Sequence, residues 1–294
     1  MIDLLKRINW KAVMYGCIWV VSLSGLVLLM SFIEIKKDST ICKDVKVIIP
    51  GNQTFVERSE IDNILQNASG QLVGRNLAQI NIHRLEAALR ANPFIEAAKV
   101  YADMNGVIQV QIKQREPLLR VLNMANQDFY IDRNGLKVPT SQVFTARVLV
   151  ANGHILENFS GIIDTLKTAL ARDLFHTALF IERDTLWRHQ IEQIFVNSKS
   201  EIELVPRVGN HKIILGNADS LQTKFTNLLM FYKKAMPKVG WGAYKTINIK
   251  YTNQVVCVKN EIDSTAIASR GRISKPLIDS LKKIKTTKDT VIKI

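Results

Sequence analysis

Residues 92–112, NPFIEAAKVYADMNGVIQVQI, contain the end of a helix followed by two strands. Asn92-Pro93 ends a helical pattern, because the residue before a proline disfavours the helical backbone region. Ala97 to Tyr101 and Val107 to Ile112 then predict two strands, and the turn Met104-Asn105-Gly106 between them favours a β-hairpin. The rest of the chain can be placed on either side of this hairpin.

Upstream of the hairpin, the sequence predicts one strand and two helices. Val45 to Ile49 is rich in β-branched residues and stops at Pro50-Gly51, as a strand followed by a turn would. Ser59 precedes the apolar set of a first helix, and Leu85, Ala88 and Leu89 mark one face of a second. The predicted order within residues 44–113 is therefore β-α-α-β-β, and Arg115-Glu116-Pro117 separates this unit from the next.

Downstream, residues 115–260 predict a larger mixed α+β domain with a mainly antiparallel sheet. Its predicted strands are residues 118–122, 128–131, 147–151, 191–196, 202–205, 211–215, 246–251 and 255–258. Its predicted helices are residues 159–170, 173–181 and 220–235. We expect Lys137, which follows a tight turn, to be exposed. After Asn260 the apolar periodicity fades, so the basic tail, residues 261–294, is expected to be disordered.

Residues 12–33 are 22 consecutive residues without a charge. As a helix they would be about 33 Å long, which is enough for the hydrocarbon core of a bilayer. Lys6, Arg7 and Lys11 precede them, and an excess of such residues marks the cytoplasmic side. We therefore expect a cytoplasmic tail (residues 1–11), one uncleaved transmembrane helix (residues 12–33) and export of the remainder. A buried core helix is the alternative.

The chain has 40 Lys and Arg residues against 26 Asp and Glu residues, a net charge of +14. Such an excess is typical of nucleic-acid-binding proteins, but the predicted export argues against a nucleic-acid partner. Anionic lipids, cell-wall polymers or an acidic protein are better candidates, and a plain solvated basic surface remains an alternative. The three cysteines do not form a disulfide scaffold, although a bridge between Cys42 and Cys257 is left open.

Recognisable catalytic motifs are missing from the sequence. The five histidines are scattered without metal-ligand spacing, and there is no Gly-x-Ser-x-Gly elbow, phosphate-binding loop or Cys-x-x-Cys pair. We therefore expect no catalytic residue, no metal, no cofactor and no small-molecule substrate. A membrane-anchored envelope enzyme or a peptidoglycan-binding protein is the alternative.

Four motifs, taken in order after one predicted span, resemble the FtsQ/DivIB family of bacterial cell-division proteins over residues 12–259. Asn92 to Val100 is similar to the family's Asn-Pro-aromatic-aliphatic segment, and Gln114 to Pro117 to its Arg-x-Pro exit. Tyr130 to Pro139 is similar to its Tyr-x-Asp-x-x-Gly-x-x-x-Pro hairpin, and Ile249 to Tyr251 to the start of its last strand pair.

The resemblance implies a POTRA domain at residues 43–114 and an FtsQ-type β domain at residues 115–260. It also implies a non-catalytic divisome scaffold at the septum, held in the inner (plasma) membrane with its large domains periplasmic or extracellular. Such a scaffold links an FtsB/FtsL-type subcomplex to other division proteins and helps to control septal peptidoglycan synthesis. The POTRA module would serve septal recruitment.

The strand at residues 254–259 is expected to be an open sheet edge that receives a strand from a partner. By resemblance, the partners are FtsB-like and FtsL-like bitopic coiled-coil proteins, and Tyr251 matches a contact tyrosine of the family. Lys259 departs from the tryptophan of familiar relatives, and a core strand with both edges covered is the alternative. The predicted partner-binding residues are Tyr251, Asn253, Gln254, Val255, Val256, Cys257, Val258 and Lys259.

Overall fold

The structure is a computed structural model that describes residues 10–51, 55–260 and 289–293. Within these ranges, the side chains of residues 10, 12, 13, 31–39 and 289–293 are not described. The chain divides into two compact units, Met1–Gln114 and Arg115–Ile294.

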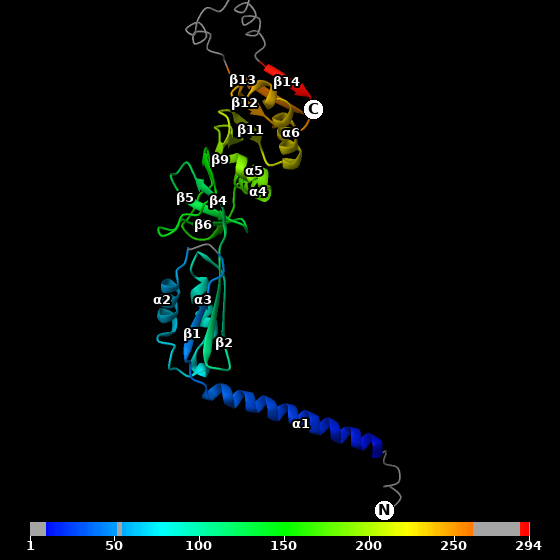
Figure 1. The fold of residues 1–294 in the computed structure, drawn as a ribbon. Helices are drawn as coiled ribbons and strands as arrows, with labels where there is room; N and C mark the ends of the chain where they lie inside the picture. Colours follow the sequence, from blue (N-terminus) through cyan, green and yellow to red (C-terminus); the bar gives the residue numbers. More distant parts are fainter. Residues whose placement is uncertain (1–9, 52–54, 261–288, 294) are drawn as a thin grey trace, which may run out of the picture. The chain divides into compact units, whose positions relative to one another are not determined.

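The first unit has the predicted β-α-α-β-β order (Figure 1). Its sheet has the strand order β1-β3-β2, with β1 parallel and β2 antiparallel to β3. Ile108, Val110 and Ile112 alternate along one face of β3 and are buried, as are Leu85 and Leu89. The elements are β1 (Asp44–Ile48), α2 (Arg58–Ser69), the 3₁₀ helix η2 (Leu77–Gln79), α3 (Ile82–Arg90), β2 (Ile95–Ala102) and β3 (Val107–Gln114).

Asn92 links the end of α3 to its neighbours. Its Oδ1 accepts a hydrogen bond from Phe94 N at 2.9 Å, and its Nδ2 donates to Glu60 Oε1 at 2.7 Å. The Asn-Pro pair therefore ends α3 and also joins it to α2. At the hairpin turn, Gly106 has φ +89°, and a Cβ there would lie 2.5 Å from Ile41 O, so only glycine fits the position.

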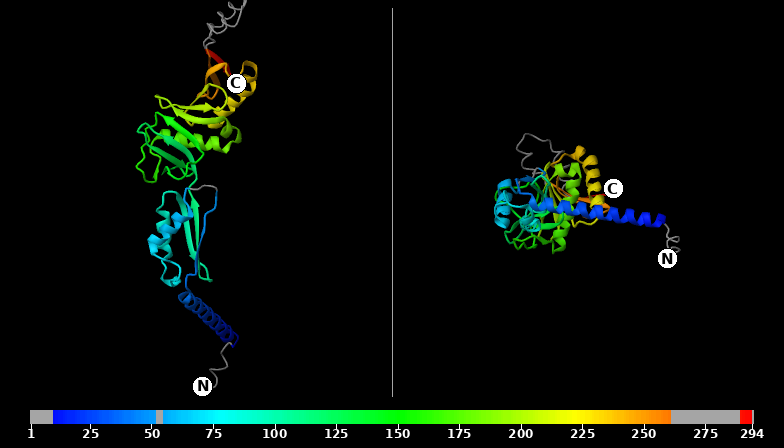
Figure 2. Two further views of the ribbon diagram at one scale, coloured as in Figure 1. Left: turned by 60° about the vertical axis from the view of Figure 1, so that its left-hand side comes forward. Right: turned by 90° about the horizontal axis from the view of Figure 1, so that it is seen from below.

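The second unit is built on one sheet of eleven described strands (Figures 1 and 2). Their order is β14-β13-β12-β11-β10-β9-β7-β4-β5-β6-β8. Only the pairs β4–β7, β7–β9 and β11–β12 are parallel, so the predicted mainly antiparallel sheet is confirmed. The strands are β4 (Pro117–Leu122), β5 (Asp128–Asp132), β6 (Leu136–Pro139), β7 (Leu149–Gly153), β8 (Asp164–Thr165), β9 (Ile191–Val196), β10 (Ile202–Pro206), β11 (Lys212–Gly216), β12 (Tyr244–Asn248), β13 (Gln254–Lys259) and β14 (Asp289–Lys293).

Four helices accompany the described sheet: α4 (Ala169–Arg183), α5 (Thr185–Gln190), α6 (Leu221–Lys234) and α7 (Met236–Val239). Leu174 of α4, Trp187 of α5 and Phe225 of α6 share one hydrophobic core with the strands. The predicted helix at residues 220–235 is confirmed as α6.

The predicted helix at residues 159–170 is wrong, because the chain is non-helical until α4 begins at Ala169. The main-chain amides of Lys167 and Thr168 are bound by the Glu157 carboxylate, and the Thr168 hydroxyl caps α4 through Ala171 N. These bonds fix the preceding segment outside the helix. The predicted strand at residues 246–251 ends early for a similar reason: Asn248 Oδ1 accepts from Lys250 N and turns the chain.

Residues Trp10–Ser39 form one helix, α1, which is longer than the predicted span of residues 12–33 and has charged residues at both ends. Within the ranges the structure describes, no helix combines the length and the apolar character that a bilayer crossing needs. Side chains 12, 13 and 31–33 of the predicted span lie outside the described ones. Of the predicted tail, residues 1–11, only residues 10 and 11 are described, and they belong to α1.

The prediction of disorder after Asn260 is wrong for residues 289–293, which form β14. Residues 261–288 and 294 of the predicted tail lie outside the described residues. Backbone pairing with β13, rather than apolar periodicity within the tail, is what gives β14 its structure. That pairing connects segments far apart in sequence, and a local pattern does not reveal it.

Candidate partner-binding site

The predicted partner-binding residues lie at one end of the second unit's sheet. β13 runs antiparallel to β12, with Ile247 opposite Cys257 and Asn248 opposite Val256. Asn227 of α6 fixes the turn before β13, because its Nδ2 donates to Thr252 O at 2.7 Å. Asn260, just after β13, donates to Gly242 O at 2.6 Å. Sequence reasoning missed both asparagines, since neither belongs to a recognisable motif.

The alternation of a strand divides the predicted site into two sets. Val255 and Cys257 are 0% exposed and belong to the hydrophobic core, so a partner cannot touch their side chains. Val256 and Gln254 are half-buried. The structure brings the remaining predicted residues to the surface of the turn and of β13: Tyr251, Asn253, Val258 and Lys259.

The predicted open edge is wrong for this structure. β14 pairs with β13 on the side away from β12, so hydrogen-bonded strands flank β13 on both edges. The alternative of a strand covered on both edges describes β13 better, although the covering strand is the chain's own C-terminal segment. The pairing with β14 shows that the outer edge of β13 accepts an antiparallel strand.

Cys257 is unsuited to nucleophilic or metal chemistry. Burial raises the pKa of its thiol to about 12, and the thiolate is the form that attacks or binds a metal. Cys42 is also buried, and both Cys42 and Cys257 are free cysteines in this structure. Among the described residues, no group of His, Cys, Asp and Glu side chains is placed to hold a metal ion.

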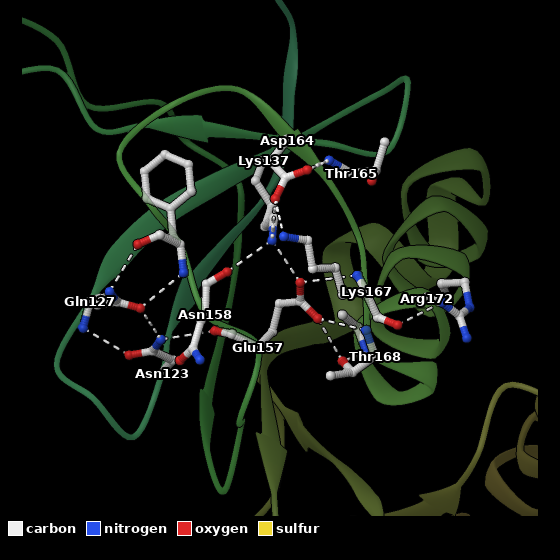
Figure 3. Close-up of polar contacts among 12 residues, drawn as sticks. Asn123, Gln127, Lys137, Glu157, Asn158, Asp164, Thr165, Lys167, Thr168 and Arg172 are labelled. Carbon is white, nitrogen blue, oxygen red and sulfur yellow. Dashed lines mark hydrogen bonds and ion pairs between the residues drawn. The ribbon is translucent and has the colours of Figure 1, made fainter.

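A cluster of buried charge lies elsewhere in the second unit, around Lys137 and Glu157 (Figure 3). Lys137 Nζ donates to Glu157 Oε1 and to Asn158 O, both at 2.8 Å. Each of the two side chains is 1% exposed. The expectation that Lys137 is exposed is therefore wrong, because the chain that follows β6 returns over it and supplies its acceptors.

Glu157 has its two oxygens fully engaged by donors. Besides Lys137, it accepts from Lys167 N at 3.0 Å, Thr168 N at 2.8 Å and Thr168 Oγ1 at 2.7 Å. Burial alone would raise the pKa of this carboxyl group, but these hydrogen bonds outweigh burial and lower it. A carboxylate so bound is ionised and occupied at neutral pH, so it holds the loop in place and is not poised to transfer protons.

Two amide side chains secure the same loop from the β4–β5 turn (Figure 3). Asn123 Nδ2 donates to Glu157 O at 2.9 Å, and Gln127 Nε2 donates to Phe159 O at 2.9 Å. Gln127 Oε1 in turn accepts from Phe159 N at 3.0 Å. The side chains of this polar cluster therefore bind the main chain of residues 157–159 and hold the loop in place, which is a structural role.

Comparison with known proteins divides the chain as the contacts do. Residues 116–258 match the family described as "FtsQ/DivIB, C-terminal related", and residues 40–113 match the POTRA-like domain. No curated protein matches the chain.

Proposed function

The chain is an FtsQ/DivIB-family protein, and from this premise we propose that it is a non-catalytic scaffold of the bacterial division machinery. Proteins of this family are generally non-enzymatic, and the family implies a septum-associated membrane protein. The observation that carries the proposal is the succession of a POTRA-like domain and an FtsQ/DivIB-related domain in one chain. We take residues 43–114 and 115–260 as their working boundaries.

The proposed partners are FtsB-like and FtsL-like bitopic proteins, which the chain would link to other division proteins and to the control of septal peptidoglycan synthesis. We place their docking site on β13 and the turn before it. Tyr251 is 48% exposed and Val258 is 40% exposed, so a partner would find side chains to contact beside the outer edge of β13, which β14 covers in this structure. The POTRA-like unit would serve recruitment to the septum.

We also propose that α1 attaches the chain to the inner membrane with its N-terminus in the cytoplasm and both large units outside. The support comes from exposed apolar side chains and from the basic residues that precede them. Large apolar side chains of α1 are exposed between Met14 and Met30, with Trp19 at 73% and Val21 at 71%. The basic residues Lys6, Arg7 and Lys11 precede them, and such residues favour the cytoplasmic side.

Val256→Pro tests the docking site, because proline removes a ladder N–H and clashes with a neighbouring strand. We expect the tagged full chain carrying Val256→Pro to lose co-purification with the FtsB-like protein while keeping most of its circular-dichroism signal. Val208→Pro, in an exposed bend between β10 and β11, is the matched control and should retain the partner.

A second variant protects this test against misfolding. Tyr251→Ala combined with Val258→Lys changes only exposed side chains and should also reduce capture. Unchanged capture by both variants would sink the assignment of β13. Pelleting of the wild-type chain with purified peptidoglycan would instead favour a wall-binding protein.

A further inference from the structure

The C-terminal strand β14 occupies the sheet edge at which the partner is expected. It pairs antiparallel with β13 over five residue pairs, from Gln254 opposite Lys293 to Val258 opposite Asp289. Figure 1 shows it beside β13 at the end of the sheet. An edge strand exposes a single row of unpaired backbone groups, so β13 can hold β14 or a partner's strand on this side, but not both.

The register shows what kind of strand this edge accepts. β14 reads Asp-Thr-Val-Ile-Lys, three β-branched residues between two charges, without Gly or Pro. Ile292 and Thr290 are opposite Val255 and Cys257, the two core residues of β13, and Val291 is opposite the half-buried Val256. Because residues directly opposite each other lie on the same face of a sheet, the edge suits a short antiparallel peptide whose alternate residues are β-branched.

We propose that β14 is a built-in competitor for the partner's strand, so that docking requires β14 to leave β13. This inference rests on the proposed docking site. A strand of the same chain competes at an effective concentration that is on the order of millimolar for short tethers. The apparent affinity of the partner is its intrinsic affinity multiplied by the fraction of molecules whose β13 edge is free. The tail would therefore keep the edge closed until a partner with the stronger strand arrives.

The test uses the full chain with β14 disrupted. Successive amides of a strand point to opposite sides, so Thr290→Pro together with Val291→Pro removes one N–H that faces β13, whichever it is. The matched control places the same two prolines just before β14, as Thr286→Pro with Thr287→Pro. The probe is a fluorescein-labelled peptide of residues 287–294, TKDTVIKI, with a scrambled peptide as its control.

We expect the β14 variant to bind the peptide at least tenfold more tightly than the wild type or the control variant. Amide hydrogen exchange at residues 254–258 should also quicken by at least tenfold in the β14 variant alone. Equal exchange in all three proteins, or no peptide binding by the β14 variant, would overturn the occupation of the edge by β14.

Capture of the FtsB-like protein separates this inference from the proposed function. If Val256→Pro abolishes capture and the β14 variant increases it, competition is supported. If Val256→Pro abolishes capture but the β14 variant leaves capture unchanged or lowers it, the partner binds while β14 is still paired with β13, and competition is refuted. If capture is insensitive to Val256→Pro, the proposed docking site itself fails, whatever the exchange data show.

Discussion

Glu157 carries a charge that is removed from water, and four donors offset the cost: the buried Lys137 ammonium, two main-chain amides and the Thr168 hydroxyl. Removing one partner of a buried pair leaves the other uncompensated, which typically costs about 3–5 kcal/mol. We therefore expect Glu157→Gln to lower the free energy of unfolding of the second unit by about that amount, measured by urea denaturation with tryptophan fluorescence. Arg133→Gln, which breaks a half-exposed pair with Glu116, should change it by about 0–1 kcal/mol.

The same residue sets a pH dependence. Because the folded-state pKa of Glu157 lies below its ordinary value of 4.5, its contribution to stability is fully present above pH 4.5. The contribution is lost as the pH falls through the folded-state pKa. The wild type should therefore lose stability more steeply below pH 4.5 than Glu157→Gln does. Parallel curves for the two proteins would contradict the assignment of the buried pair.

Residue-level environments were the least predictable part of this chain. Lys137 follows a turn of polar residues, and nothing local reveals that Glu157, twenty residues later, returns to bury it. The inward positions of β13 were different. Their period-two pattern places Val255 and Cys257 on one face. The sequence alone does not show that this face of β13, and not the other, is buried in the core.

At the scale of elements, Thr168 connects the polar cluster around Glu157 to the start of α4. Its hydroxyl donates to Glu157 Oε2 and accepts from Ala171 N, so it is both a cap and part of the cluster. Thr168→Val keeps the volume but loses both bonds, and we expect it to lower the free energy of unfolding by about 1–2 kcal/mol. Thr168→Ser keeps the hydroxyl and should remain close to wild type. A loss for Thr168→Ser, with Thr168→Val close to wild type, would show that volume, not capping, matters here.

Elements that form among neighbouring residues were predictable, whereas elements that depend on distant pairing were not. The β2–β3 hairpin and α3 follow from turn residues and apolar spacing within twenty residues or so. β8 and β14 are short strands that exist because β6 and β13 offer them an edge. The non-helical run before α4 likewise depends on Glu157, a long-range acceptor that no helical pattern takes into account.

At the scale of the whole molecule, the order of motifs was more informative than any one of them. Asn92-Pro93, Arg115-Glu116-Pro117 and the Tyr130–Pro139 hairpin predicted two successive units, and the family matches cover the same two stretches. The state of the β13 edge could not be read in this way, because it depends on where the end of the chain returns. The placement of these units outside the membrane is still a proposal, and it can be tested with single cysteines.

Val143 is 73% exposed in the second unit, whereas Lys137 is fully buried. The natural Cys42 and Cys257 are buried, and burial raises the pKa of both thiols, so they should react slowly. Cys17 is exposed and is replaced by Ser.

In sealed spheroplasts we expect Val143→Cys to react with a membrane-impermeant maleimide, and Lys137→Cys to react only after denaturation. Asp3→Cys should react only after permeabilisation, because the basic residues near it favour the cytoplasmic side. The reverse order, with Asp3→Cys accessible and Val143→Cys protected, would refute the proposed topology and leave the family assignment intact.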